Sequence, residues 1–469
     1  MRGFLYWAIQ HKWLLVAFVA GGLLLIPPLP ADLSPKGREA LVIALVAMIL
    51  FVTEPIPLPT IALLIAVSQV LFSIATPTRV AHTFMNDSVF FILGSLMLAV
   101  AIVKQRLDRR LAVAIFRFTG PKIERIIFGI ISVCGLMASL IGEHTVAAIM
   151  LPVVMSLIRH AGEDPKKAPR LSALLLFSVA YACAIGGLGT PSGGARNAIM
   201  IEYWSRLYHI KVSYFDWIKY AYPLVILQTP VLWSVLLRRF KPEKTDLSTA
   251  IRKLKAQVLW EGKMRSRDWL AVAIFIFTLL MWVFLSGKIG LGTPALIGVS
   301  LYLIAGLVEW EDLNAGVNWG VFLIYASTIS LGVAIEETGA AGWVAQKFMQ
   351  ATSAMDIHAG FPLLASVAVL TVAVSSFISR APALGILTPI VLSVARDTGT
   401  SVLAMGFATA LASAFTYMTV IGSPPNTIIF SSGYVQTKDY LRAGVWMTVA
   451  SLLLLLLYAE TYWRLVLPA

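Results

Sequence analysis

The sequence predicts an all-α polytopic membrane protein with about 11 transmembrane helices and two re-entrant hairpins, arranged as inverted repeats. Three observations lead to this fold class. Of the 469 residues, 58% are hydrophobic and 13% are charged, and apolar windows long enough to cross a bilayer recur along the chain. Two of the apolar runs are interrupted near their middle by polar residues. Short motifs also recur in the same order in the two halves.

Six predicted spans and one hairpin make up the first half. The spans cover residues 13–28, 40–52, 58–74, 89–103, 171–201 and 221–237. No small-residue cleavage site follows the first apolar run, so we interpret it as a first helix and not as a signal peptide. Two prolines in the motif Thr53-Glu54-Pro55-Ile56-Pro57 predict a break between the second and third spans, because neither fits inside a regular helix.

The apolar run 126–158 predicts the first hairpin because basic residues flank both of its ends. These flanking residues are Lys122 and Arg125 on one side, and Arg159, Lys166, Lys167 and Arg170 on the other. Since Lys and Arg beside apolar spans stay on the cytoplasmic side, a segment that enters the membrane and turns back satisfies both clusters. Its tip then places Gly142, Glu143, His144 and Thr145 at mid-membrane depth, where ionisable groups face a cavity or a partner.

The fifth span, 171–201, is predicted to unwind at its centre. Five glycines and Pro191 lie between residues 186 and 197, and so many breakers are incompatible with a continuous helix. Unwound backbone at this depth is tolerated only beside protein or a wet cavity. We therefore expect this stretch to border a functional site.

A polar segment, 238–268, separates the halves. It contains ten Lys and Arg against four Asp and Glu, and is predicted to be cytoplasmic, like the basic cluster Lys104, Arg106, Arg109 and Arg110 after the fourth span. The second half has predicted spans at 269–285, 294–308, 321–335, 402–431 and 445–465. Its hairpin, 361–395, breaks at Ser379, Arg380, Ala381 and Pro382. Counting crossings from a cytoplasmic N-terminus leaves the C-terminus outside.

Short motifs relate the halves to each other. Asn86-Asp87-Ser88-Val89-Phe90 precedes the first hairpin as Asn318-Trp319-Gly320-Val321-Phe322 precedes the second. Gly193-Gly194-Ala195-Arg196-Asn197 follows the first hairpin as Gly422-Ser423-Pro424-Pro425-Asn426 follows the second. By the crossing count the repeats run in opposite directions. Inverted repeats with broken helices at the midplane are typical of secondary transporters.

Glu143, His144 and Arg380 are the candidate functional residues at the two tips. Glu143 and His144 form either a satisfied pair or a protonation site or substrate contact, since burial and histidine chemistry both allow proton uptake. Arg380 stays charged and requires an anionic partner. That partner is either Glu143, in a structural pair, or a carboxylate or oxyanion of a substrate, which the guanidinium binds with two hydrogen bonds. We favour substrate contact.

Arg196 is a further candidate for contact with an anion. Its side chain either belongs to the site or extends along the helix to the membrane surface. Neutral hydrogen-bonding groups accompany it at Thr190, Ser192, Ser423 and Asn426. The half-helices that begin at the breaks also direct the positive ends of their dipoles toward the middle. Pro152 and Pro389 each lie ten residues after the start of a break and are interpreted as kinks in the returning arms.

Several function classes are disfavoured. The net charge is +13, and the basic residues cluster in short loops between the apolar spans. We interpret them as anchors of the loops at the anionic membrane surface and not as a nucleic-acid-binding surface. Two cysteines within apolar segments suggest neither a disulfide framework nor a metal site. No phosphate-binding loop and no metal-ligand spacing is found, so the sequence predicts no enzyme, no catalytic residue, no metal and no cofactor.

Over nearly its whole length the chain resembles the divalent anion/sodium symporter (DASS) family. The resemblance is carried by residues 53–57, by the run 182–197, by Gly422 to Asn426, and by Ser432-Gly433-Tyr434 with Lys438-Asp439-Tyr440. It implies a homodimer and an elevator-type division into scaffold and transport domains. Residues 1–120 and 203–335 would be scaffold, with the linker 238–268, and residues 121–202 and 336–431 would form the transport domain. Residues 432–469 would contribute the last helix.

This sequence departs from the family at both hairpin tips. Members carry Ser-Asn-Thr there, which helps to bind sodium and substrate, whereas this chain has Gly142-Glu143-His144 and Ser379-Arg380-Ala381. The resemblance implies substrate contacts at Glu143, His144, Thr145, Gly194, Arg196, Asn197, Ser379, Arg380, Ala381, Ser423, Pro424 and Asn426. It implies ion or proton coupling at Glu143, His144, Gly193 and Gly422.

We therefore expect a multi-pass protein of the cell (plasma) inner membrane that transports a small anion, a di- or tricarboxylate, by an elevator mechanism. A permanent guanidinium at a tip repels sodium, so coupling is expected to protons or to exchange of another anion. Two alternatives are kept, namely a carrier of an inorganic oxyanion such as sulfate, and a receptor or scaffold that does not transport.

Overall fold

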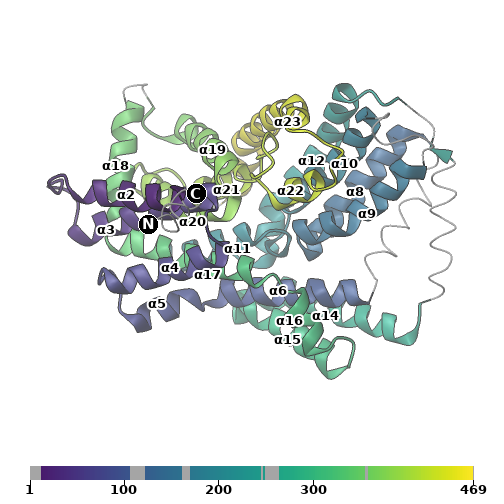
Figure 1. Cartoon of the computed structure of the whole chain (residues 1–469), viewed down its shortest axis with the longest axis horizontal. Coiled ribbons are helices and arrows are strands. Elements are labelled where there is room, and N and C mark those ends of the chain that lie inside the picture. Colours follow the sequence, from purple (N-terminus) through teal and green to yellow (C-terminus); the bar gives the residue numbers. More distant parts are fainter. Residues whose placement is uncertain are drawn as a thin grey trace, which may run out of the picture.

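The chain is described from a computed structural model (Figure 1). The structure describes residues 12–105, 122–160, 169–243, 247–248, 264–353 and 357–467. Several sequence predictions concern residues outside these ranges, namely the segment before residue 12, the basic residues Arg106, Arg109, Arg110, Lys166 and Lys167, and most of the polar segment 238–268.

The described part of the first half consists of helices joined by short connections. They are α2 Lys12–Leu25, α3 Pro35–Thr53, α4 Leu58–Leu71, α5 Pro77–Phe84, α6 Asp87–Lys104, α8 Ile123–Ile141, α9 Glu143–His160, α10 Pro169–Gly186, the short helix η1 Pro191–Gly193, α11 Ala195–Tyr208 and α12 Tyr214–Arg239.

The second half continues the same architecture. Its elements are α14 Ser266–Ile289, α15 Gly292–Ile304, α16 Trp310–Gly316, α17 Trp319–Glu337, α18 Ala340–Ser353, α19 Gly360–Phe377, α20 Arg380–Asp397, α21 Val402–Ala412, α22 Pro424–Phe430, α23 Thr437–Tyr458, the π-helical turn η2 Ala459–Trp463 and α24 Arg464–Val466.

The prediction of an all-α polytopic membrane protein is confirmed. Among the described residues, 8 helices are long and apolar enough to cross a membrane, and shorter apolar helices accompany them. Each of the predicted spans falls on a helix or on a broken helix. Leu71, Phe284 and Ile304 expose 76%, 73% and 83% of their surface, which is expected of side chains that face lipid and not water.

Both predicted hairpins are present. α8 and α9 turn at Gly142, whose φ of +88° lies in the left-handed region that favours glycine, and their arms pack against each other. α19 and α20 turn at Ile378 and Ser379 and likewise pack together. Pro152 lies inside α9 and Pro389 inside α20, as the sequence predicted for the returning arms.

The two broken helices have the same internal hydrogen bonding. In each, an asparagine side chain donates to two backbone carbonyls of the unwound stretch, ten and seven residues earlier. Asn197 donates to Gly187 and Thr190 at 2.8 and 2.7 Å, and Asn426 donates to Thr416 and Thr419 at 3.0 and 2.8 Å. The matched pattern supports the internal repeat that the short motifs predicted.

The helices preceding the hairpins match as well. Asn86 caps α6 by accepting from the backbone N–H of Val89 at 2.9 Å, and Asn318 caps α17 by accepting from Val321 at 3.1 Å. Packing partners are also exchanged between the halves, since α6 lies on α15 and α17 lies on α4. Such reciprocal contacts are what a two-fold relation between repeats produces.

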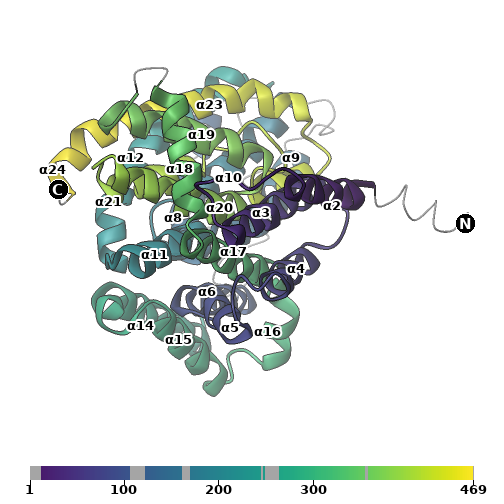
Figure 2. The ribbon, with the colours of Figure 1, turned by 90° about the vertical axis from the view of Figure 1, so that its left-hand side faces the viewer.

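Figures 1 and 2 show two groups of helices. α4, α5, α6 and α14 to α16 form one group at the bottom of Figure 1, while α8, α9, α10, α12 and α19 to α23 lie above it. α17 joins the groups, because it packs on α4 on one side and on α20 on the other. α11 also packs on α6.

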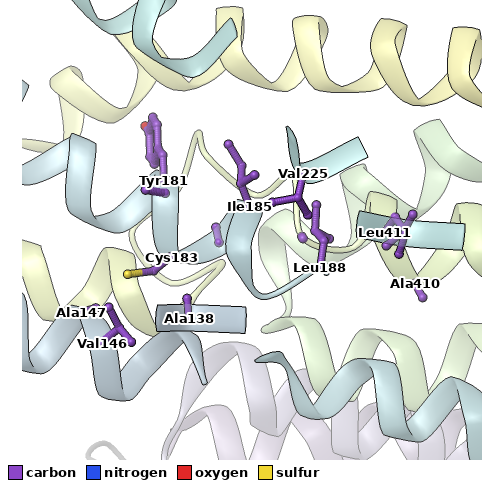
Figure 3. Close-up of a cluster of buried hydrophobic side chains, with 14 of the residues drawn as sticks. Ala138, Val146, Ala147, Tyr181, Cys183, Ile185, Leu188, Val225, Ala410 and Leu411 are labelled. Carbon is purple, nitrogen blue, oxygen red and sulfur yellow. The ribbon is translucent and has the colours of Figure 1, made fainter. Parts of the chain in front are cut away.

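The core of the upper group lies around the broken helix α10. This helix is buried from Leu171 to Gly186. Figure 3 shows Ala138 of α8, Cys183 of α10, Val225 of α12 and Leu411 of α21 in one apolar cluster. Close packing on all sides fixes the two ends of the unwound stretch, and with them the position of the polar groups that it carries.

Candidate functional site: a buried charged cluster beside a cleft

Three charged side chains meet at the hairpin tips and the first broken helix. Glu143 is the first residue of α9, Arg380 is the first residue of α20, and Arg196 is the second residue of α11. The Nη1 atom of Arg380 lies 2.6 Å from Oε2 of Glu143, and Nη1 of Arg196 lies 2.9 Å from Oε1. Exposure is only 5% for Glu143, 2% for Arg196 and 3% for Arg380.

The cluster bears on two alternatives that the sequence left open. Arg380 already has an acidic partner, Glu143, so the structural pair is the arrangement that the structure contains. Arg380 also donates from Nε to Oγ1 of Thr416 at 3.1 Å, and Thr416 donates to the carbonyl of Gly422 at 3.0 Å. Arg196 does not extend to the surface, because it is buried in the same cluster.

The cluster carries more positive than negative charge. Two guanidinium groups face one carboxylate, and these three are the only fully buried charged side chains among the described residues. Nη2 of Arg380 and Nε of Arg196 are buried and have no described hydrogen-bond partner. Burying an unbalanced charge is costly, so a second anion beside the cluster would offset that cost.

Local backbone requirements explain why glycines surround the cluster. A Cβ atom at Gly187 would lie 3.0 Å from Oε2 of Glu143, and one at Gly194 would lie 2.9 Å from Nη1 of Arg196. Both distances are shorter than ordinary van der Waals contact. Glycine at these positions of the unwound stretch therefore leaves the space that the charged side chains occupy.

A cleft of about 1340 Å³ lies directly beside the cluster. Chain neighbours of the charged residues form one wall, with His144 and Thr145 from the first tip and Ser379 and Ala381 from the second. Pro424 of the second broken helix also lines it, and the opposite wall comes from α3, α4, α6, α16 and α17. The cleft is thus placed between the two groups of helices, at the tips that the sequence singled out.

An ion pair forms part of the cleft lining. Nζ of Lys104 is 2.5 Å from Oδ1 of Asp312, and both residues line the cleft. The hydrogen bond from Lys104 lowers the pKa of the Asp312 carboxyl below its ordinary value. Glu54, also in the lining, ends α3 in the left-handed conformation with φ 42°, in the predicted break between α3 and α4.

The remaining predicted residues hold the unwound stretches in shape. Gly193 and Gly422 occupy matched positions, where their backbone N–H groups donate to Oγ1 of Thr190 at 3.0 Å and of Thr419 at 3.2 Å. Gly194 precedes α11, and Ser423 caps α22. The side-chain oxygens of Asn197 and Asn426 are buried and have no partner in the described part of the chain. The described residues contain no group of metal-ligating side chains.

Sequence reasoning missed Thr416 and Tyr325. Thr416 accepts a hydrogen bond from Arg380, and Tyr325 of α17 lines the cleft beside the charged cluster. The repeat does contain a signal for Tyr325. When Asn86 is aligned with Asn318, Tyr325 is a polar residue at the position where the first repeat has the apolar Leu93. No comparable signal marked Thr416.

Two inverted repeats, each with a hairpin and a broken helix that meet beside a cleft, define the architecture of secondary membrane transporters. The chain belongs to the family described as the sodium:sulfate symporter transmembrane region, which matches residues 9–468. The resemblance inferred from the sequence motifs is thereby confirmed.

Individual relatives cover nearly the whole chain. The sodium-dependent dicarboxylate transporter SdcS of Staphylococcus saprophyticus is 25% identical over 480 residues, which cover 94% of this chain and 90% of SdcS. SdcS of Staphylococcus aureus is 25% identical over 472 residues, with the same coverage. The crystal structure of the YdaH transporter of Alcanivorax borkumensis has a TM-score of 0.57 and 14% identity, covers 83% of this chain and 88% of YdaH, and supports the fold alone.

Proposed function

We propose that the protein is a secondary active transporter of a small carboxylate, a di- or tricarboxylate, in the plasma membrane. The observation that carries this proposal is the excess positive charge of the buried Arg196–Glu143–Arg380 cluster beside a cleft. Three half-helices begin at this cluster, and the positive ends of their dipoles add to its attraction for an anion. The dicarboxylate-transporting relatives support the same substrate class.

We further propose an elevator mechanism in a homodimer. The upper group of helices together with α11 contains both hairpins and both broken helices, and it would move as a transport domain against the lower group. The domain division expected from the sequence needs one adjustment in this proposal. α12 packs on α8, α10 and α23, so we assign it to the transport domain and not to the scaffold.

Transport is proposed to be independent of sodium, in contrast to the relatives named as sodium-dependent. A second cation about 4 Å from an arginine would be repelled by roughly 4 kcal/mol at the effective dielectric of a protein surface. Arg380 and Arg196 would supply permanently the positive charge that bound sodium supplies elsewhere. Coupling would then be to protons or to exchange of another anion.

Labelled succinate uptake into proteoliposomes preloaded with unlabelled succinate tests this function. We expect uptake well above that of empty liposomes, and stronger competition from succinate or citrate than from sulfate. Preferential competition by sulfate would favour the inorganic oxyanion alternative. Absence of flux under every anion and pH gradient would contradict the proposal and favour a receptor that does not transport.

Arg380→Ala supplies the residue-specific arm of the same experiment. Uptake is expected to be lost, because the remaining cluster is electrically neutral. The protein is expected to stay folded, since Glu143 keeps Arg196 as its partner. Size-exclusion chromatography of the purified variant checks the fold, and unchanged uptake by this variant would contradict a role of the excess charge.

A further inference from the structure

Tyr325 differs from the other polar groups on the scaffold side of the cleft. Five polar or charged side chains line that side, namely Glu54, Lys104, Asp312, Asn318 and Tyr325. Lys104 and Asp312 neutralise each other, and Asn318 accepts a hydrogen bond from the backbone of its own helix. Glu54 carries the same charge as the proposed substrate.

Besides the amide N–H groups of Asn318, the hydroxyl of Tyr325 is the neutral donor that this wall offers to an anion. It has no hydrogen-bond partner among the described residues, and its helix, α17, packs on α20, which begins at Arg380. His144, next to Glu143, and Ser379, next to Arg380, line the same cleft as Tyr325. A substrate held beside the tips at His144 and Ser379 would lie between the cluster and this hydroxyl.

The repeat shows that the other half of the chain has no equivalent donor. Aligning the capping residues Asn86 and Asn318 matches Val89 with Val321 and places Leu93 of α6 at the position of Tyr325. In inverted-repeat transporters the two halves exchange roles when the cleft opens to the opposite face. α6 already lines the cleft through Leu96 and Lys104, and in the opposite state the position equivalent to Tyr325 would present Leu93 instead of a phenol.

We propose that Tyr325 is a one-sided substrate contact, which binds the anion only when the cleft opens as in this structure. This inference rests on the proposed anion transport and elevator motion. We assign the open face to the cytoplasmic side, because Lys104, which begins a basic cluster predicted to be cytoplasmic, lines the cleft. Tyr325 thus gives the carrier different affinities for one substrate at its two faces.

The test compares Tyr325→Phe with the wild-type protein in inside-out and right-side-out membrane vesicles, using labelled succinate. Loss of a hydrogen bond to a charged group is expected to raise KM about tenfold at the cytoplasmic face. KM at the outer face is expected to stay unchanged. Tyr325→Leu, which installs the residue of the other repeat, is expected to have the same one-sided effect.

Tyr208→Phe provides the matched control. Tyr208 has a buried hydroxyl without a described partner, but it lies at the end of α11 and does not line the cleft. This variant is expected to leave KM unchanged at both faces.

An equal rise in KM at both faces for Tyr325→Phe, or no rise at either face, would overturn the inference while the transport function stands. Absence of succinate transport by the wild-type protein in both kinds of vesicle would instead contradict the proposed function, and the inference with it.

Discussion

Glu143 connects two arginines that come from different parts of the chain. Each of its two carboxylate oxygens accepts a hydrogen bond from one guanidinium group. Removal of Glu143 therefore differs in its effect on the charge balance from removal of either arginine. Loss of Glu143 leaves two buried positive charges without an acid. Loss of Arg196 leaves a balanced pair of Glu143 and Arg380.

This asymmetry predicts the order of stability of two variants. Glu143→Gln is expected to lower the free energy of unfolding by about 3–5 kcal/mol, the usual cost of removing one partner from a buried ion pair. Arg196→Gln is expected to cost clearly less. Denaturant or thermal unfolding of the purified variants in detergent measures both, and an Arg196→Gln variant that is as unstable as Glu143→Gln would contradict the charge account.

The identity of the cluster could be predicted from the sequence only in part. Charges at the hairpin breaks marked Glu143 and Arg380, and Glu143 was one of the two partners considered for Arg380. The sequence did not indicate that Arg196 shares the same carboxylate. These residues are 53 and 237 positions from Glu143, so their meeting depends on how the broken helix and the second hairpin pack.

At the scale of elements, the contact between α17 and α20 joins the two groups of helices. Gly332 of α17 faces the carbonyl of Gly385 in α20 and the hydroxyl of Tyr203 in α11. Tyr203 donates to this same carbonyl at 2.9 Å. Because Gly332 has no side chain, the backbones of α17 and α20 can approach each other, and the hydroxyl of Tyr203 fits between them.

Gly332→Ala is therefore expected to be destabilising. Its Cβ atom would lie 1.8 Å from the hydroxyl oxygen of Tyr203 and 2.5 Å from the carbonyl oxygen of Gly385. Overpacking of this kind costs about 1–3 kcal/mol. The control is Gly342→Ala in α18, where the nearest atom is 3.8 Å away. Equal melting temperatures for the two variants would show that the α17–α20 contact is looser than described.

The bilayer-length elements followed from the sequence, whereas short elements and the 14-residue helix α18 did not. Apolar length and flanking charge predicted each span, and the prolines and glycines marked the breaks near residues 54, 142 and 187. α5 has 8 residues and α16 has 7, which is too short for a bilayer-length window to detect. α12 begins at Tyr214, earlier than the predicted span, because a capping box at Ser213 starts it outside the apolar run.

The whole molecule consists of two repeats whose backbones fold alike, while their hairpin tips carry side chains of opposite charge. Asn197 and Asn426 hold equivalent unwound stretches, yet equivalent tip positions carry Glu143 in one repeat and Arg380 in the other. The opposite charges pair across the centre of the molecule. Together with Arg196 they leave one positive charge at the place where the two hairpins meet a cleft.

Labelled succinate counterflow in proteoliposomes, with sodium replaced by choline on both sides, tests this charge account most directly. Since the arginines would already supply the positive charge, the wild-type protein is expected to transport at the same rate in choline as in sodium. Arg380→Ala is expected to transport in neither. Wild-type counterflow that collapses in choline and recovers with sodium would contradict the claim that buried arginines take the place of bound cations.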